Sequence, residues 1–318
     1  MATSVDCVCL TGPTACGKTE LALRLAEHVP LEVVSMDSAL VYRGMDIGTA
    51  KPSLAVRQQV PHHLIDIIDA SEAYSAGRFV RDAEAKVEEI KARGRLPLLV
   101  GGTHLYLRAI RDGIADLPEA DSTVRNQLDA EAEMLGWPAL HERLASIDPD
   151  AAERISPSDG QRIQRALEVF ELTGKSLTDQ QRASHATATL TVKTFAVLPT
   201  DRGALAERIE QRFDSMVAEG FVEEVEKFKA REDLSPTTPA MRAVGYRQMW
   251  AYLAGECSWA EARDRALAAT RQLAKRQLTS LRSDALAETL ALEGQDVERT
   301  FAVAVQAVVT SNGHELSN

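Results

Sequence analysis

The hydrophobic positions of the chain fall into short apolar runs that are separated by amphipathic helical segments. Four apolar runs predict buried strands, at residues 5–10, 31–35, 96–100 and 190–198. Between them lie segments with helical spacing. One of these predicts a helix over residues 75–93, which Gly94 terminates. Strands without polar alternation that are joined by helices are typical of a parallel sheet covered on both faces. The predicted fold class is therefore α/β, with a parallel sheet core covered by helices.

A helical block interrupts this strand and helix pattern. Residues 117–188 contain no convincing strand and predict several helices. We therefore expect an α/β core domain formed by residues 1–116 and 189–318, and an all-helical insertion at residues 117–188. Further helices are predicted at residues 203–230, 240–254 and 258–290. The acidic segment 284–318 is expected to be a solvated, frayed tail.

Composition and charge exclude several classes of protein. The 318 residues are 45% apolar and 26% charged, and this balance excludes a disordered chain. The net charge of −11 argues against a protein that coats nucleic acid or an anionic membrane non-specifically. No apolar run reaches about 18 residues, and the first basic residue is Lys18, so a cytoplasmic protein without a membrane segment is expected. Cys7 and Cys9 alternate along the first strand and are expected to pack in the core as reduced thiols.

The segment between the first predicted strand and the first predicted helix matches the phosphate-loop pattern G-x-x-x-x-G-K-[ST]. It consists of Gly12, Pro13, Thr14, Ala15, Cys16, Gly17, Lys18 and Thr19. Its glycines allow backbone N–H groups to converge on phosphate oxygens, and the following helix adds its positive end. Lys18 supplies a mobile charge, and the Thr19 hydroxyl can bind Mg²⁺. We therefore predict a P-loop NTPase-like core that binds phosphate groups, with Mg²⁺ as cofactor.

The carboxylate that usually accompanies such a loop stands at an unusual position. NTP-hydrolysing proteins carry it at the end of a second apolar strand, where it holds Mg²⁺. In this chain the strand at residues 96–100 is followed by Gly101, Gly102 and Thr103, whereas Asp37 follows the strand at residues 31–35. At that place Asp37 could accept a proton from an acceptor substrate. The structural alternative is that Asp37 is a helix N-cap or a turn residue.

Basic residues are concentrated near the end of the chain in spite of the acidic total. Residues 242–282 contain eight basic and three acidic residues. On a helix, Arg271, Lys275 and Arg282 would share one stripe, which could face a phosphate backbone. A solvated face with local ion pairs is the alternative for this stripe.

Longer motifs extend the pattern along nearly the whole chain, in a fixed order from residue 10 to about residue 283. After the phosphate loop they include DSALVY at residues 37–42, MDIGTAKP at 45–52, PHH at 61–63, YSA at 74–76, GGT at 101–103, QRIQRALE at 161–168, VGYRQ at 244–248 and TRQLAKRQ at 270–277. Together these motifs resemble the bacterial tRNA dimethylallyltransferase family. One departure is Cys16, where the family commonly has serine.

The resemblance implies transfer of a dimethylallyl group from dimethylallyl diphosphate to the exocyclic amine of the adenosine 3′-adjacent to the anticodon in tRNA, with release of diphosphate. It implies that the phosphate loop binds the diphosphate, that Asp37 accepts the amine proton, and that Lys18, Thr19 and Thr103 complete the catalytic set. The resemblance and the basic residues of segment 242–282 together predict the residues that contact tRNA. They are Asp37, Ser38, Ala39, Leu40, Thr103, Arg125, Gln161, Arg162, Ile163, Gln164, Arg165, Arg242, Arg247, Arg271 and Lys275. The expected partners are the tRNA anticodon stem-loop and dimethylallyl diphosphate, and the protein is expected to be a monomer.

Two other functions stay open from the residues alone. One is an ATP-binding phosphate-loop kinase for a nucleoside or a small alcohol, and the other is a nucleotide-gated binding module without chemistry. A kinase would transfer the γ-phosphate of ATP, whereas a binding module would form no covalent product. The missing carboxylate after the strand at residues 96–100 and the helical insertion favour the transferase.

Overall fold

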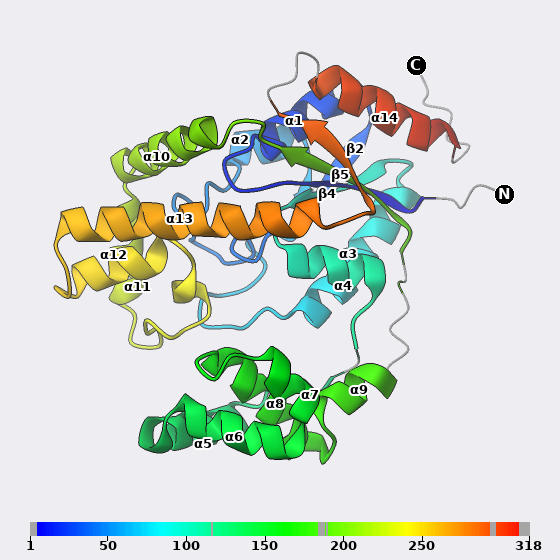
Figure 1. Cartoon of the computed structure of the whole chain (residues 1–318). Helices are drawn as coiled ribbons and strands as arrows, with labels where there is room; N and C mark the ends of the chain where they lie inside the picture. The colour runs from blue at the N-terminus through cyan, green and yellow to red at the C-terminus, as the bar shows by residue number, and fades with distance from the viewer. Residues whose placement is uncertain (1–4, 116, 184–187, 189, 293–296, 312–318) are drawn as a thin grey trace. The chain divides into compact units, whose positions relative to one another are not determined.

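The computed structural model describes residues 5–115, 117–183, 188, 190–292 and 297–311 of the chain (Figure 1). The chain divides into two compact units. The core unit consists of Met1–Arg111 with Thr189–Asn318, and the helical unit is Asp112–Ala188. The sequence pattern predicts this helical block at residues 117–188.

A six-stranded parallel sheet forms the centre of the core unit, in the order β3-β2-β4-β1-β5-β6. The strands are β1 (Cys7–Thr11), β2 (Leu31–Ser35), β3 (His62–His63), β4 (Leu96–Gly101), β5 (Val192–Leu198) and β6 (Ala287–Ala291). The four predicted strands are confirmed and occupy the four central positions, where every residue of β1 and β2 is buried. The two edge strands were not predicted, because β3 has two residues and β6 buries only Leu290.

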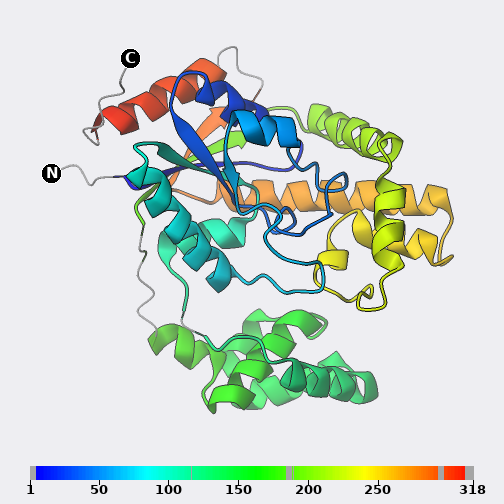
Figure 2. The same cartoon turned by 180° about the vertical axis from the view of Figure 1, so that it is seen from behind.

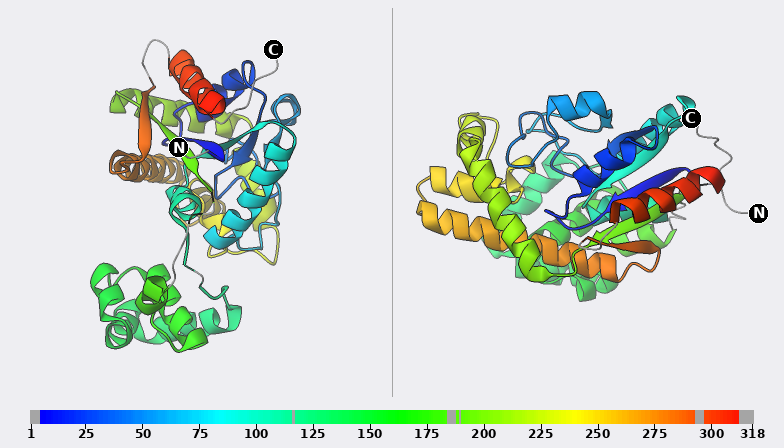
Figure 3. Two further views of the ribbon diagram at one scale, coloured as in Figure 1. Left: turned by 90° about the vertical axis from the view of Figure 1, so that its right-hand side faces the viewer. Right: turned by 90° about the horizontal axis from the view of Figure 1, so that it is seen from above.

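Helices cover both faces of this sheet (Figure 2, Figure 3). The helices α1 (Lys18–Ala26) and α14 (Val297–Ser311) pack on one face, and α3 (Ala76–Ala92) and α4 (His104–Asp112) pack on the other. Successive side chains of β1 point to opposite faces of the sheet. Val8 therefore packs in the layer of α1 and α14, and Cys7 and Cys9 pack in the layer of α3 and α4. Both thiols are fully buried, and burial raises the pKa of Cys9 to about 12. Their predicted packing role in the core is confirmed.

The helices between β5 and β6 form a second core with the chain between β2 and α3. The helices are α10 (Arg202–Ala218), α11 (Phe221–Lys229), the 3-10 helix η1 (Ala240–Arg242), α12 (Tyr246–Leu253) and α13 (Trp259–Arg282), and α2 (Leu54–Gln59) precedes β3. Two predicted helices are broken in the structure, because Gly220 (φ 100°) separates α10 from α11 and Gly245 (φ 93°) precedes α12. Backbone at positive φ cannot continue a right-handed helix.

The end of the chain corrects two of the expectations. The predicted helix at residues 258–290 ends at Arg282, and the segment expected as a frayed tail contains β6 and α14. Phe301 and Val305 of α14 are fully buried, and the Phe301 ring lies edge-on to Phe195 with 5.4 Å between centroids. The expectation was wrong because it followed the acidic charge of the segment and not its apolar residues, which make up nine of the 15 positions of α14. Residues 293–296 and 312–318 of that segment lie outside the described residues.

The helical unit contains the helices α5 (Ser122–Leu135), α6 (Trp137–Ile147), α7 (Pro149–Arg154), α8 (Gly160–Thr173) and α9 (Leu177–Ala183). They enclose a core of their own, which includes Leu128, Leu144 and Ile163. Within the described part of the chain, none of the helices combines the length and the apolarity that crossing a membrane requires.

Glu32 of β2 is expected to make the stability of the core unit depend on pH. Its side chain is 4% exposed and accepts hydrogen bonds from Arg93 at 2.7 and 2.9 Å, and it lies 2.6 Å from His63. The hydrogen bonds from Arg93 and from His63, opposed by burial, lower the Glu32 pKa from 4.5 to about 2. We expect Glu32 to contribute about 2–3 kcal/mol at neutral pH, and this contribution to be lost as the pH falls from about 4.5 towards 2.

Denaturant unfolding of the wild type and of Glu32→Gln, measured between pH 7 and pH 3, checks this expectation. The difference in unfolding free energy should be largest above about pH 5 and should shrink by more than half by about pH 3, because the wild-type carboxylate must take up a proton when it unfolds. A difference that is constant over this range would show that the ion pair does not control the acid stability.

Candidate active site

The phosphate loop lies at the carboxyl end of β1, directly before α1 (Figure 1). Its backbone is left-handed at Ala15 (φ 60°) and Gly17 (φ 75°), and α1 begins at Lys18. Gly12 has no room for a side chain, because a Cβ there would lie 2.7 Å from the Val197 carbonyl oxygen. The loop therefore wraps around the start of α1, where free N–H groups and the helix dipole favour an anion.

Lys18 extends its ammonium group across this loop. Its Nζ donates hydrogen bonds to the carbonyl oxygens of Gly12 at 3.0 Å and Pro13 at 2.7 Å, and lies 3.7 Å from Cys16 Sγ. The Cys16 side chain is buried beneath the loop. Thr19 lines the same cavity as Lys18. A mobile cation and a hydroxyl group thus flank the start of the helix, as phosphate binding requires.

Asp37 and Thr103 come together at the carboxyl ends of the neighbouring strands β2 and β4. Gly101 permits this close approach, because a Cβ there would lie 2.0 Å from the Met36 carbonyl oxygen. The Thr103 hydroxyl accepts a hydrogen bond from the Ser38 amide at 3.1 Å. Asp37, Ser38 and Thr103 all line one cavity, so the structure brings these three predicted residues to one place.

The surroundings of Asp37 decide between a cap and a turn. Its Oδ1 accepts a hydrogen bond from the Ala39 amide at 2.8 Å, which forms an Asx turn. The next helix, α2, begins at Leu54 and is capped by Ser53, so Asp37 is not a helix N-cap. Among the described residues nothing donates a hydrogen bond to its Oδ2. One carboxylate oxygen thus holds the turn while the other is available to a substrate.

Gln277 of α13 connects the phosphate loop with the end of β4. Its Oε1 accepts a hydrogen bond from the Thr14 amide at 2.9 Å, and its Nε2 donates one to the Gly102 carbonyl oxygen at 2.9 Å. Sequence reasoning did not assign Gln277 to the site. The signal was present in the TRQLAKRQ motif, but a polar residue on a basic helix gives no sign that it contacts a loop 263 positions earlier in the chain.

Two cavities of the core unit meet beside Asp37. The first, of about 580 Å³, contains the phosphate loop and is called the phosphate cavity. The second, of about 480 Å³, is lined by Thr103 and by side chains of α10, α11, α12 and α13, and is called the helix cavity. The residues that line both are Thr14, Ala15, Asp37, Thr49, Gly102, Arg212, Leu273 and Gln277. A molecule bound at the phosphate loop and another that enters the helix cavity would therefore meet at Asp37.

Arg212 of α10 places a second cation at this meeting point. It lines both cavities, and its Nη2 donates a hydrogen bond to the Thr49 carbonyl oxygen at 3.3 Å. Burial lowers the Arg212 pKa, and the charge of Asp37 acts against this shift. An arginine stays protonated in such a place, so a half-buried positive charge lies beside Asp37 where the two cavities meet. This position of Arg212 was not predicted, because it is one of several charged residues on an amphipathic helix.

The basic segment 242–282 contains two kinds of residue. Arg263 pairs with Asp214 at 2.9 Å and with Glu210 at 2.8 Å, and Arg265 lies 4.0 Å from Glu261. These two arginines therefore form local ion pairs with neighbouring carboxylates. The other six cations have no carboxylate within 4.0 Å among the described residues. They are Arg242, Arg247, Arg271, Lys275, Arg276 and Arg282, and all six are exposed. Arg242 and Arg276 line the helix cavity, and Arg271 and Lys275 lie further along the surface of α13.

The predicted tRNA-binding residues of the helical unit differ in their accessibility. Gln161 and Arg162 are exposed. Arg125 and Arg165 both pair with the fully buried Glu168, at 2.8 and 2.6 Å, and each keeps about a third of its side chain exposed. Gln164 donates a hydrogen bond to Asp129 at 2.7 Å.

Ile163 corrects one assignment. Its side chain is fully buried in the core of the helical unit, so it cannot present that side chain to an RNA. The motif that suggested a contact runs along a helix, and one face of that helix is the core.

The sequence and the fold both match known proteins. A family model described as IPP transferase matches residues 40–284. The chain is 56% identical over 275 residues to the tRNA dimethylallyltransferase of Alkalilimnicola ehrlichii, covering 86% of this chain and 87% of that protein. It is 53% identical over 307 residues to the tRNA dimethylallyltransferase of Paraburkholderia xenovorans, covering 95% of this chain and 97% of that protein.

Two solved structures have the same fold. The full-length tRNA isopentenylpyrophosphate transferase from Bacillus halodurans has a TM-score of 0.70 and 36% identity, covering 96% of this chain and 97% of that chain. A eukaryotic dimethylallyltransferase acting on tRNA has a TM-score of 0.78 and 25% identity, covering 96% of this chain and 79% of that chain. The agreement in sequence extends over most of this chain and of its bacterial relatives. The chain therefore belongs to the IPP transferase family, the family of the tRNA dimethylallyltransferases that its motifs resemble.

Proposed function

We propose that this protein transfers a dimethylallyl group from dimethylallyl diphosphate to the exocyclic amine of the adenosine 3′-adjacent to the anticodon in tRNA. The observation that carries the proposal is the junction of the two cavities, where Asp37 and Arg212 lie between a phosphate loop and a chamber lined by Thr103. The names of the relatives support the same reaction. In the transfer, the bond between the allylic carbon and the diphosphate oxygen breaks, a bond from that carbon to the amine nitrogen forms, and diphosphate leaves.

The phosphate loop would bind the diphosphate. Its backbone N–H groups and Lys18 would stabilise the charge that develops as the diphosphate leaves, together with Arg212, which lines the same cavity. Oxygen ligands are those that Mg²⁺ prefers, and the Thr19 hydroxyl in the phosphate cavity fits this chemistry together with the diphosphate oxygens. When bound there, Mg²⁺ neutralises charge on the leaving group.

Asp37 would accept the proton of the amine. An adenine amine is a weak nucleophile, so removal of its proton as the new bond forms assists the reaction. The free Oδ2 of Asp37 is the acceptor for this proton, while Oδ1 holds the turn to Ala39. Thr103, fixed by the Ser38 amide, would lie beside the adenine.

The adenosine must leave the stacked anticodon loop to reach Asp37, which requires a chamber for the base and a surface for the stem-loop. The helix cavity would receive the base, with Arg242 and Arg276 at its lining. Arg247, Arg271 and Lys275 would contact RNA phosphates. We also propose that Gln161, Arg162 and the exposed parts of Arg125 and Arg165 contribute tRNA contacts from the helical unit, and that the protein is a cytoplasmic monomer.

An incubation of the protein with unmodified tRNA, dimethylallyl diphosphate and Mg²⁺ tests the function. Nucleoside mass spectrometry should find dimethylallyl adenosine at the position 3′ to the anticodon, with one diphosphate released per modification and no requirement for ATP. Transfer of the γ-phosphate of ATP would support the kinase instead, and the absence of any covalent product would support a binding module.

The exposed cations of α13 predict a strong dependence of tRNA binding on salt. A chain of net charge −11 needs a local basic surface to bind RNA, so the affinity should fall by about 0.7–0.9 log units per released counterion for each log unit of salt. Reversal of charge at Arg271 and Lys275 should weaken binding and flatten this slope. Fluorescence titrations of tRNA at several salt concentrations measure both quantities.

A matched control reverses the charge of Arg24 and Lys86, two surface cations that have carboxylate partners. This variant has the same net charge as the α13 variant and should keep the wild-type slope. An unchanged slope for the α13 variant would mean that Arg271 and Lys275 only contact solvent.

A further inference from the structure

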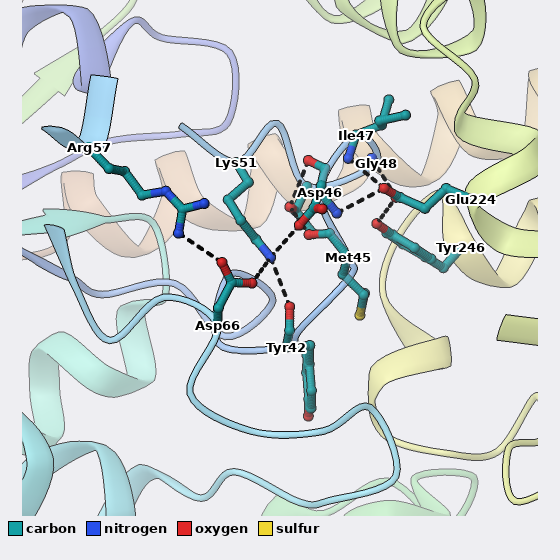
Figure 4. Close-up of polar contacts among 11 residues, drawn as sticks. Tyr42, Met45, Asp46, Ile47, Gly48, Lys51, Arg57, Asp66, Glu224 and Tyr246 are labelled. Carbon is teal, nitrogen blue, oxygen red and sulfur yellow. Dashed lines mark hydrogen bonds and ion pairs between the residues drawn. The ribbon is translucent and has the colours of Figure 1, made fainter. Parts of the chain in front are cut away.

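Glu224 of α11 is a buried carboxylate that holds a distant loop (Figure 4). Its Oε2 accepts hydrogen bonds from the Asp46 amide at 2.9 Å and the Ile47 amide at 2.8 Å. Its Oε1 accepts hydrogen bonds from the Gly48 amide at 3.1 Å and from the Tyr246 hydroxyl of α12. Four donors thus converge on one carboxylate, which is 7% exposed. Hydrogen bonds to a charged acceptor in a buried place are strong, so Glu224 fixes this loop firmly.

Lys51 holds the same loop from its other end (Figure 4). Its side chain is 2% exposed, and its Nζ donates hydrogen bonds to the Tyr42 carbonyl oxygen at 2.9 Å, to Asp46 at 2.6 Å and to Asp66. The segment 45–51, called the MDIGTAK loop, is therefore anchored to α11 and α12 at one end and to the chain after β2 at the other. A loop with two buried charged anchors is rigid.

The MDIGTAK loop forms part of the wall of the candidate active site. Gly48 and Thr49 line the helix cavity, and Thr49 also lines the phosphate cavity. The Thr49 carbonyl oxygen accepts the hydrogen bond of Arg212, the cation that lines both cavities. Phe221 packs so closely on Gly48 that a Cβ on this glycine would lie 2.0 Å from its ring. Helix α11 therefore sets the position of the loop through Phe221 and Glu224.

We propose that Glu224 is a positioning residue for the transfer reaction, which it serves by holding the MDIGTAK loop so that the Thr49 carbonyl orients Arg212 towards the leaving diphosphate. The inference rests on the function proposed above. Glu224 lines neither cavity, so it acts through the groups that it bonds, which are the loop amides and the hydroxyl of Tyr246, a residue that lines the helix cavity. A shift of the loop would move the guanidinium group away from the charge that it stabilises in the transition state, and small displacements of such groups are costly.

The substitution Glu224→Gln tests the network with little change in size. An amide has one acceptor oxygen and one NH₂ group, so at least one of the three backbone amides loses its acceptor. Tyr246→Phe removes only the hydroxyl and leaves all three amides bonded, so its effect should be smaller. Glu226→Gln is the matched control, because it makes the same change at an exposed position of the same helix.

Single-turnover transfer with saturating tRNA and dimethylallyl diphosphate separates a positioning role from a purely structural one. Glu224→Gln should lower the rate constant by about 10-fold with an unchanged amplitude, and Tyr246→Phe by about 2- to 3-fold. Loss of folded protein would instead lower the amplitude and leave the rate constant unchanged. The affinity for tRNA should change by less than about 2-fold, because the exposed cations of α13 are untouched.

A double-mutant cycle with Arg212→Lys shows whether Glu224 acts through Arg212. In the Arg212→Lys background, Glu224→Gln should have little further effect on the rate constant, since the group that it orients is already replaced. Full additivity of the two substitutions, or a rate constant for Glu224→Gln equal to that of Glu226→Gln, would overturn the inference. Absence of transfer by the wild type would overturn the proposed function instead, so the two failures are distinguishable.

Discussion

Replacement of Lys18 by alanine is expected to lower the transfer rate by about 10³-fold or more while tRNA binding is largely kept. The Lys18 ammonium group lies on the carbonyl oxygens of Gly12 and Pro13 within the phosphate loop, where the diphosphate charge would develop. Substitution removes the mobile charge of the loop, and Arg212 cannot replace it because it lies at the junction with the helix cavity. Steady-state turnover of dimethylallyl diphosphate and a tRNA binding titration measure the two effects.

The control for this prediction is Arg24→Ala, which removes a cation from the same helix outside both cavities. It should keep turnover within about 2-fold of the wild type, because an exposed ion pair contributes little. Normal turnover by Lys18→Ala would contradict the assignment of residues 12–19 as the diphosphate site.

Replacement of Asp37 by asparagine is expected to lower the rate of transfer by about 10²- to 10⁴-fold. The asparagine side-chain oxygen can still accept the hydrogen bond from the Ala39 amide, so the Asx turn is retained. Only the basicity of the group is lost, and with it the acceptor for the amine proton. Single-turnover kinetics with both substrates saturating isolates the chemical step, and tRNA binding should be unaffected.

Asp69→Asn is the matched control for Asp37→Asn. Asp69 also accepts a backbone hydrogen bond two residues on, from Ser71 at 2.9 Å, but it lines neither cavity. Its substitution should leave the rate near that of the wild type. A near-normal rate for Asp37→Asn as well would reduce Asp37 to a turn residue, and another group would have to accept the proton.

Local patterns in the sequence predicted the central strands, the helix α3 that precedes Gly94 and the phosphate-loop motif. These features depend on residues that are close together in the chain, such as the apolar run before Gly12 and the helix after Lys18. The same local reasoning was wrong about the tail. The apolar residues of α14 bury against α1, and this depends on a partner about 280 residues earlier in the chain.

The sequence by itself determined the α/β class, the place of the phosphate-loop motif between β1 and α1 and the family to which the chain belongs, because these depend on short-range spacing and on long motifs in a fixed order. Only the tertiary structure decided which of many similar polar and charged residues line the site or support its wall. Arg212, Gln277 and Glu224 come from three different helices, and each forms a hydrogen bond with a residue more than 150 positions away in the chain. On a helix their spacing is that of ordinary polar positions. Their roles follow from the packing of α10, α11 and α13 around the carboxyl ends of the strands, where charge that is shielded from water acts most strongly.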